Sequence, residues 1–180
     1  MFLMKKYEVL GFFFISLISG LLAVLFWLLP SSLILDGLGP TTDSLWQVGK
    51  LMFMSILVYT IIEYFIFGRR FDNFAFAKGA TLFVAPLLFI GLSYLIDLGL
   101  GNATISNHII TYLIAIVAGQ YVSAYIMRSG YYFKMMNGYA IIGIILTLTM
   151  FIGYGRSVDS FNAPIFKTMN NYKTHILYQK

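Results

Sequence analysis

The chain has 180 residues, of which 59% are hydrophobic and only 11% are charged. Soluble domains are nearer half apolar and a quarter charged, so this composition excludes a soluble globular protein and predicts a chain solvated by lipid. The net charge of +5 lies mostly in short segments beside apolar runs, which suits anionic lipid headgroups. We therefore expect membrane lipids, and no nucleic acid, as partners.

Apolar runs long enough to cross a bilayer occur five times along the chain. The first run follows Lys5 and Lys6 and ends at Pro30, and its length favours a retained signal anchor over a cleaved signal peptide. The predicted fold is an all-α transmembrane bundle in a single membrane domain, followed by a polar tail over residues 155–180. The predicted spans cover residues 9–29, 45–67, 79–98, 108–127 and 138–154.

Between the first two spans, residues 30–42 are rich in Gly, Pro, Ser and Thr and predict a loop. The second span begins with a capping box, in which Ser44 and Gln47 satisfy free backbone amides at the helix start. Trp46 is expected at the headgroup level as an interfacial anchor.

The later spans are joined by connectors of two kinds. A basic connector over residues 69–78 leads into the third span, which contains Pro86 and is expected to be kinked there. A glycine-rich turn over residues 99–102 leads to the fourth span, and a second basic connector over residues 128–137 leads to the fifth.

Basic residues in short loops predict the orientation of the spans. Most basic residues outside the C-terminal tail lie in the segments on one side of the predicted bundle, whereas the loops on the opposite side hold only one basic residue, Lys50. We therefore expect a multi-pass protein of the cell membrane with a cytoplasmic N-terminus. With five spans the basic C-terminal tail lies on the outer side of the membrane. The alternative to five spans is a sixth, half-inserted segment over residues 161–169. The predicted cytoplasmic basic residues are Lys5, Lys6, Arg69, Arg70, Lys78, Arg128 and Lys134.

The order Asp43-Ser44-Leu45-Trp46-Gln47, followed by Lys50-Leu51, stands at the start of the second span. It resembles the motif Asn-Glu-Ser-(Val/Ile)-Trp-Glu-His-x-Lys-Leu of a family of small five-helix bacterial membrane proteins, catalogued only as a domain of unknown function. Further similarities are Glu63-Tyr64, the segment 73–78 and the segment 164–167, so the resemblance covers nearly the whole chain. It implies the architecture and no specific chemistry.

The chain departs from that motif at three positions, where Thr42, Gln47 and Val48 replace the family's Asn, Glu and His. If those polar groups carry an activity in the family, this chain lacks them.

Glu63 is the most informative single residue, because it lies inside the second span near its inner end. An ionisable group within a span is costly unless it is paired, and it indicates a functional site by default. One interpretation is a carboxylate that reaches the interface and pairs with Arg70, seven residues on. The other is a site for a substrate, a proton or a lipid headgroup.

At the outer end of the same span, Asp43, Trp46, Gln47 and Lys50 lie within two helical turns. They could form an external polar pocket, although residues of these types are also common as structural caps at helix starts.

Gln120 lies in the middle of the fourth span, where an amide usually makes an interhelical hydrogen bond and less often lines a path for a solute. Gly119 beside it, and Ser16 with Gly20 in the first span, are expected to allow close helix packing or oligomerisation.

The sequence holds no catalytic motif and no metal-ligand spacing around His108 or His175, so we expect no metal and no cofactor. The leading hypothesis is a non-enzymatic membrane protein that acts by binding lipid, a protein partner or a second copy of itself. The first alternative is a small-solute transporter or substrate-binding subunit using Glu63 and Gln120. The second is a lipid-modifying enzyme using Asp43 and Lys50.

Overall fold

The computed structural model describes residues 2–30, 32–100, 104–129 and 135–154, and it describes no side chain before Leu10. All regular structure in these ranges is helical, which confirms the predicted all-α bundle. The elements are α1 (Phe2–Leu28), α2 (Leu33–Leu38), α3 (Leu45–Ile66), the 3-10 turn η1 (Gly68–Arg70), α4 (Phe74–Leu100), α5 (Ile105–Arg128) and α6 (Asn137–Tyr154).

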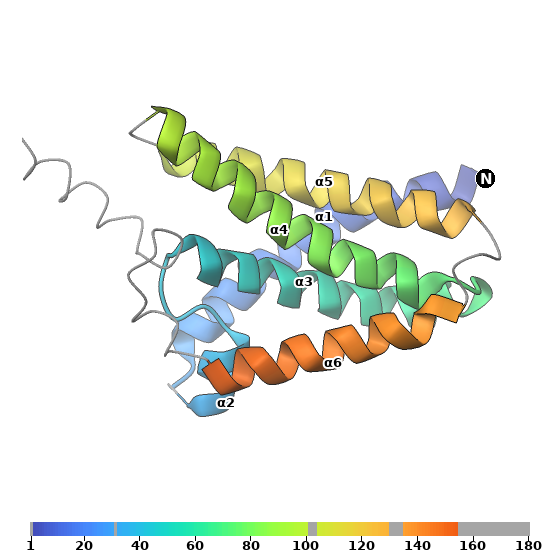
Figure 1. Ribbon diagram of the computed structural model, residues 1–180, viewed down its shortest axis with the longest axis horizontal. Helices are drawn as coiled ribbons and strands as arrows, with labels where there is room; N and C mark the ends of the chain where they lie inside the picture. The colour runs from blue at the N-terminus through green and yellow to red at the C-terminus, as the bar shows by residue number, and fades with distance from the viewer. Residues whose placement is uncertain (1, 31, 101–103, 130–134, 155–180) are drawn as a thin grey trace, which may run out of the picture.

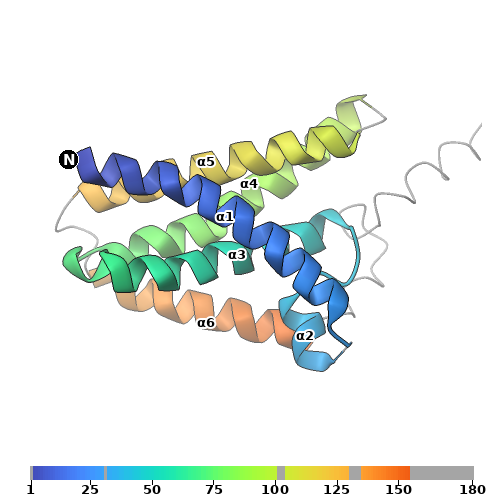
Figure 2. The same cartoon turned by 180° about the vertical axis from the view of Figure 1, so that it is seen from behind.

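The long helices run up and down the bundle in chain order (Figure 1). Helices α3, α4 and α5 pack in sequence, and α4 and α5 form the most extensive pair. Helix α1 crosses α3 and α5 on one side, whereas α6 packs against α4 and α2 on the other (Figure 2).

Among the described residues, four helices are long and apolar enough to cross a membrane, namely α1 from Leu10, α3, α4 and α5. The fifth predicted span corresponds to α6, whose apolar part covers only Asn137–Gly153. Seventeen residues at about 1.5 Å each give about 26 Å, slightly less than the hydrocarbon thickness of about 30 Å. In the described residues one long helix corresponds to each predicted span, but four of these helices, not five, have full spanning length.

Several helix boundaries differ from the prediction, among them the start of α1 at Phe2 instead of residue 9 and the start of α5 at Ile105 instead of residue 108. Two further differences have a visible cause in the structure. The expected loop over residues 30–42 contains the short helix α2, whose start is capped by Ser32 accepting a hydrogen bond from the Leu35 amide. Helix α4 begins at Phe74 instead of residue 79, because the side-chain oxygen of Asn137 accepts a hydrogen bond at 2.8 Å from the Phe76 amide in its first turn. A cap that comes from a residue 61 positions later is invisible in the local sequence.

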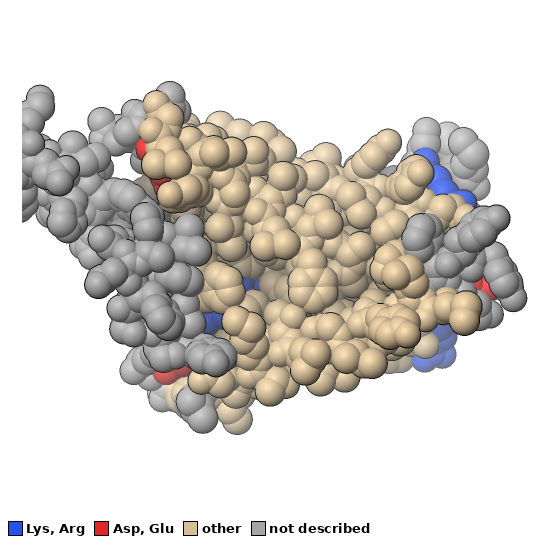
Figure 3. Space-filling model, viewed as in Figure 1, with Lys and Arg blue, Asp and Glu red and all other residues tan. Residues whose placement is uncertain are grey.

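Most charged residues visible in Figure 3 lie toward the two ends of the bundle. Arg69, Arg70 and Arg128 lie at the end where α3 and α5 finish, which we call the basic end. On the face shown in Figure 3, most of the surface between the two ends is uncharged. Lys134, the proposed half-inserted segment and the tail lie outside the described residues.

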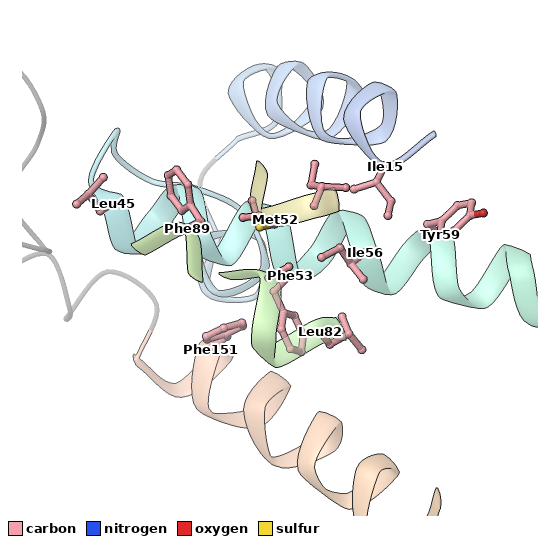
Figure 4. Packing of buried hydrophobic residues seen from close by; sticks show 12 residues of the cluster. Ile15, Leu45, Met52, Phe53, Ile56, Tyr59, Leu82, Phe89 and Phe151 are labelled. Carbon is pink, nitrogen blue, oxygen red and sulfur yellow. The ribbon is translucent and has the colours of Figure 1, made fainter. Parts of the chain in front are cut away.

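The core forms around α3, whose buried residues cluster with residues of α1, α4, α5 and α6 (Figure 4). Ser44 caps α3 as predicted, since its side chain accepts a hydrogen bond from the Gln47 amide. A β-carbon added at Gly119 would lie 2.9 Å from the Ala85 β-carbon, so this glycine lets α4 and α5 approach closely, as predicted. Gly20 faces open space, so it packs against no other helix in the described residues, and the alternative of oligomerisation stays a prediction.

Candidate functional site

A buried ion pair joins α3 to α4. The Glu63 Oε2 and Lys78 Nζ atoms lie 2.6 Å apart, and both side chains are at most 2% exposed. The predicted partner of Glu63 was Arg70, but Arg70 lies in η1 with its side chain exposed. The earlier start of α4 is the reason, because it places Lys78 inside a helix next to Glu63 rather than in a connector. The prediction of Lys78 as a surface anchor is therefore wrong.

Two further groups surround the Lys78 ammonium. It donates a hydrogen bond at 3.4 Å to the Gln120 side-chain oxygen on α5, an interhelical bond of the kind expected for an amide within a span. The rings of Tyr59 and Phe74 lie with their centroids 5.8 and 5.9 Å from the same nitrogen, within cation–π range. We call Tyr59, Glu63, Lys78 and Gln120 the polar cluster.

Helix α1 closes the polar cluster from its remaining side. A β-carbon added at Gly11 would lie 2.8 Å from the Gln120 side-chain nitrogen and 3.1 Å from the Tyr59 hydroxyl oxygen. The absence of a side chain at Gly11 thus lets α1 cover the cluster directly. Helices α1, α3, α4 and α5 therefore meet at the polar cluster. The charges of Glu63 and Lys78 compensate each other there, whereas a single buried charge would destabilise the protein.

The residues predicted at the far end of α3 do not converge on one pocket. Lys50 is buried and donates a hydrogen bond at 2.8 Å to the backbone oxygen of Asp36 in α2. Trp46 is half-buried with its ring edge-on to Phe151 of α6, so it packs against that helix, and its position at the headgroup level stays a prediction. Asp43 is exposed. Lys50 thus holds α2 against α3, and Trp46 holds α6 against α3.

Sequence reasoning missed an acid–base contact at the same end of the bundle. The His108 Nε2 and Asp97 Oδ1 atoms lie 3.4 Å apart, joining the end of α4 to the start of α5. The two residues are eleven positions apart, and the packing of α4 against α5 brings them together. No three metal-ligating side chains gather among the residues that the structure describes.

A groove runs along the outer side of the bundle between α1 and α5. Its volume is about 560 Å³. It was not predicted, because its depth depends on how far apart α1 and α5 lie. The groove is lined by Phe12 of α1 and by Leu113, Ile114, Val117, Ala118, Tyr121 and Val122 of α5.

The fold and the apolar helices together define a helical membrane-spanning protein, by helix length and composition. The chain matches no protein-family model, no curated protein and no solved structure. The resemblance to a five-helix family consequently gains no support beyond its short motifs.

Proposed function

We propose that the protein is a non-enzymatic membrane protein that binds a lipid acyl chain in the groove between α1 and α5. The observation that carries this proposal is the groove itself, a concave apolar surface on the outside of the bundle. Its residues on α5 extend from Leu113 to Val122, which is about 14 Å at 1.5 Å per residue. One leaflet of hydrocarbon is about 15 Å thick, so the groove suits one acyl chain.

The polar cluster is buried inside the bundle, which supports a structural role for the cluster and a binding role for the groove on the outer surface. Glu63 and Gln120 are at most 4% exposed, and each contacts Lys78. This arrangement favours a structural role for them over a role in transport. Lipid modification would need Asp43 and Lys50 to act together, but Lys50 contacts the α2 backbone and Asp43 is exposed. Neither alternative has an observation in its favour.

The orientation belongs to the same proposal. Arg69, Arg70 and Arg128 lie at one end of the bundle, together with the start of α1. Basic residues concentrate on the cytoplasmic side of membrane proteins, so we place the N-terminus in the cytoplasm. The chain has no cysteine, so a single cysteine at Arg70 can be labelled cleanly. Labelling of intact cells with an impermeant maleimide is expected to fail there, and efficient labelling would reverse the orientation.

Photo-crosslinking tests the groove. The purified protein in nanodiscs is exposed to a phospholipid that carries a diazirine on its acyl chain, and crosslinked peptides are mapped by mass spectrometry. We expect crosslinks to concentrate on the α5 groove residues and to be mostly lost in Ala118→Trp, because the indole fills the groove. Leu87→Trp is the matched control, since Leu87 is 67% exposed on α4. Crosslinks spread evenly over all exposed helices would contradict the proposal.

A further inference from the structure

The face of α5 that lines the groove continues toward the basic end. Ile114, Tyr121 and Arg128 follow one another at seven-residue intervals. Seven residues are nearly two helical turns, with a drift of only about 20°, so the three residues lie on one face. Ile114 and Tyr121 line the groove, and Arg128 is exposed in the last turn of α5. The groove therefore has a cation in line with it.

The distance along α5 between the groove and Arg128 matches the distance between the acyl chain and the headgroup of a phospholipid. Arg128 lies six residues beyond Val122, the last groove residue, which is about 9 Å along the helix axis. The headgroup region of a leaflet is about 5 to 7 Å thick, and a long arginine side chain can adapt to it. An acyl chain lying in the groove would thus bring its phosphate to the level of the Arg128 guanidinium.

Two exposed tyrosines lie on α5 near the end of the groove that is closer to Arg128, one in the groove lining and one beyond it. Tyr121 is 73% exposed, and Tyr125, one turn further, is 66% exposed. Tyrosine is enriched at the membrane interface, because its ring is apolar and its hydroxyl group is polar. These two residues place the boundary between hydrocarbon and headgroups at this part of α5.

The apolar groove cannot by itself select one lipid. An acyl chain in a bilayer is already in hydrocarbon, so entering the groove gains packing contacts without a hydrophobic driving force. Selectivity must come from the headgroup, where each basic residue near the surface attracts anionic lipid. Arginine also binds phosphate oxygens through two parallel hydrogen bonds.

We infer that the lipid in the groove is an anionic phospholipid whose phosphate group binds Arg128. This inference rests on the proposed function, and it adds the chemical class of the ligand. The exposed residues Arg69 and Arg70 lie at the same end of the bundle. The positive charge there favours a headgroup with net negative charge over a zwitterionic one.

The test compares two diazirine lipids with identical acyl chains, a phosphatidylglycerol and a phosphatidylcholine, in nanodiscs that hold both in equal amounts. We expect the phosphatidylglycerol probe to crosslink the groove more than the phosphatidylcholine probe. Arg128→Gln is expected to reduce that preference about fivefold, the effect of one basic residue near an anionic surface. Arg128→Lys should keep most of it.

Arg70→Gln is the matched control, because it removes one exposed charge at the basic end outside the groove. An equal loss of preference in Arg70→Gln and Arg128→Gln would overturn the inference, since diffuse attraction would then explain the preference. Equal groove crosslinking by both probes would overturn it too, while leaving the proposed function intact. If neither probe labels the groove above the rest of the surface, the proposed function fails as well.

Discussion

Gln120 and Tyr121 are neighbours on α5, and they belong to opposite kinds of environment. Gln120 is 4% exposed and contacts Lys78 in the polar cluster, whereas Tyr121 is 73% exposed and lines the groove. The polar cluster binds four helices of the same chain to one another. The groove presents apolar side chains to whatever surrounds the protein.

The difference shows how burial separates structural from binding groups in a membrane bundle. Charged groups cannot face hydrocarbon without a cost, so Glu63 and Lys78 contact one another inside. Apolar groups gain little from being inside, because lipid solvates them equally well. Substitutions in the cluster are therefore expected to change stability, and substitutions in the groove to change binding.

The largest effect is expected from Lys78→Met, which leaves the Glu63 carboxylate buried without its cation. Removing one partner of a buried ion pair typically costs about 3 to 5 kcal/mol. The thermal unfolding midpoint in mild detergent is expected to fall sharply. The double variant Glu63→Met with Lys78→Met should recover most of the loss, because no charge remains buried.

If Lys78→Met had the same thermal unfolding midpoint as the wild type, the ion pair between Glu63 and Lys78 would not hold the helices together. Glu63 and Lys78 would in that case be candidates for a functional rather than a structural role.

A smaller loss is expected from Gly119→Leu. The first side-chain carbon alone would lie 2.9 Å from the Ala85 β-carbon and 3.0 Å from the Thr81 Cγ2 atom, so α4 and α5 must separate. Overpacking of this kind costs about 1 to 3 kcal/mol. Gly91→Leu on α4 is the control, because Gly91 faces open space and should tolerate the change. Equal midpoints for the two variants would show that the α4–α5 contact is looser than the structure indicates.

The smallest effects sharpen the contrast between the two neighbours. Gln120→Leu removes one interhelical hydrogen bond and is expected to cost about 0.6 kcal/mol. Tyr121→Leu should leave the unfolding midpoint unchanged but weaken crosslinking of the groove by the diazirine lipid. If Tyr121→Leu destabilised the protein more than Gln120→Leu did, the assignment of the inner and outer faces of α5 would be wrong.

Local sequence signals predicted the features that depend on neighbours in the chain. The Ser44 cap is one, because its hydrogen bond reaches only three residues ahead. The interhelical hydrogen bond of Gln120 is another, since an amide within an apolar run has few other ways to be satisfied. The partner of Glu63 was predicted wrongly, because Lys78 lies fifteen positions further along and was assigned to a connector.

The order of residues along the chain is enough to establish apolar helices of membrane-spanning length, separated by short segments that contain basic residues. That follows from the energy of placing residues in hydrocarbon, which each residue contributes locally. Three features become apparent only in the tertiary structure. Helix α4 starts at Phe74, where Asn137 from α6 caps it. Glu63 contacts Lys78, and a groove lies between α1 and α5. These features depend on where helices distant in the sequence come to lie, which helix packing sets and local composition does not.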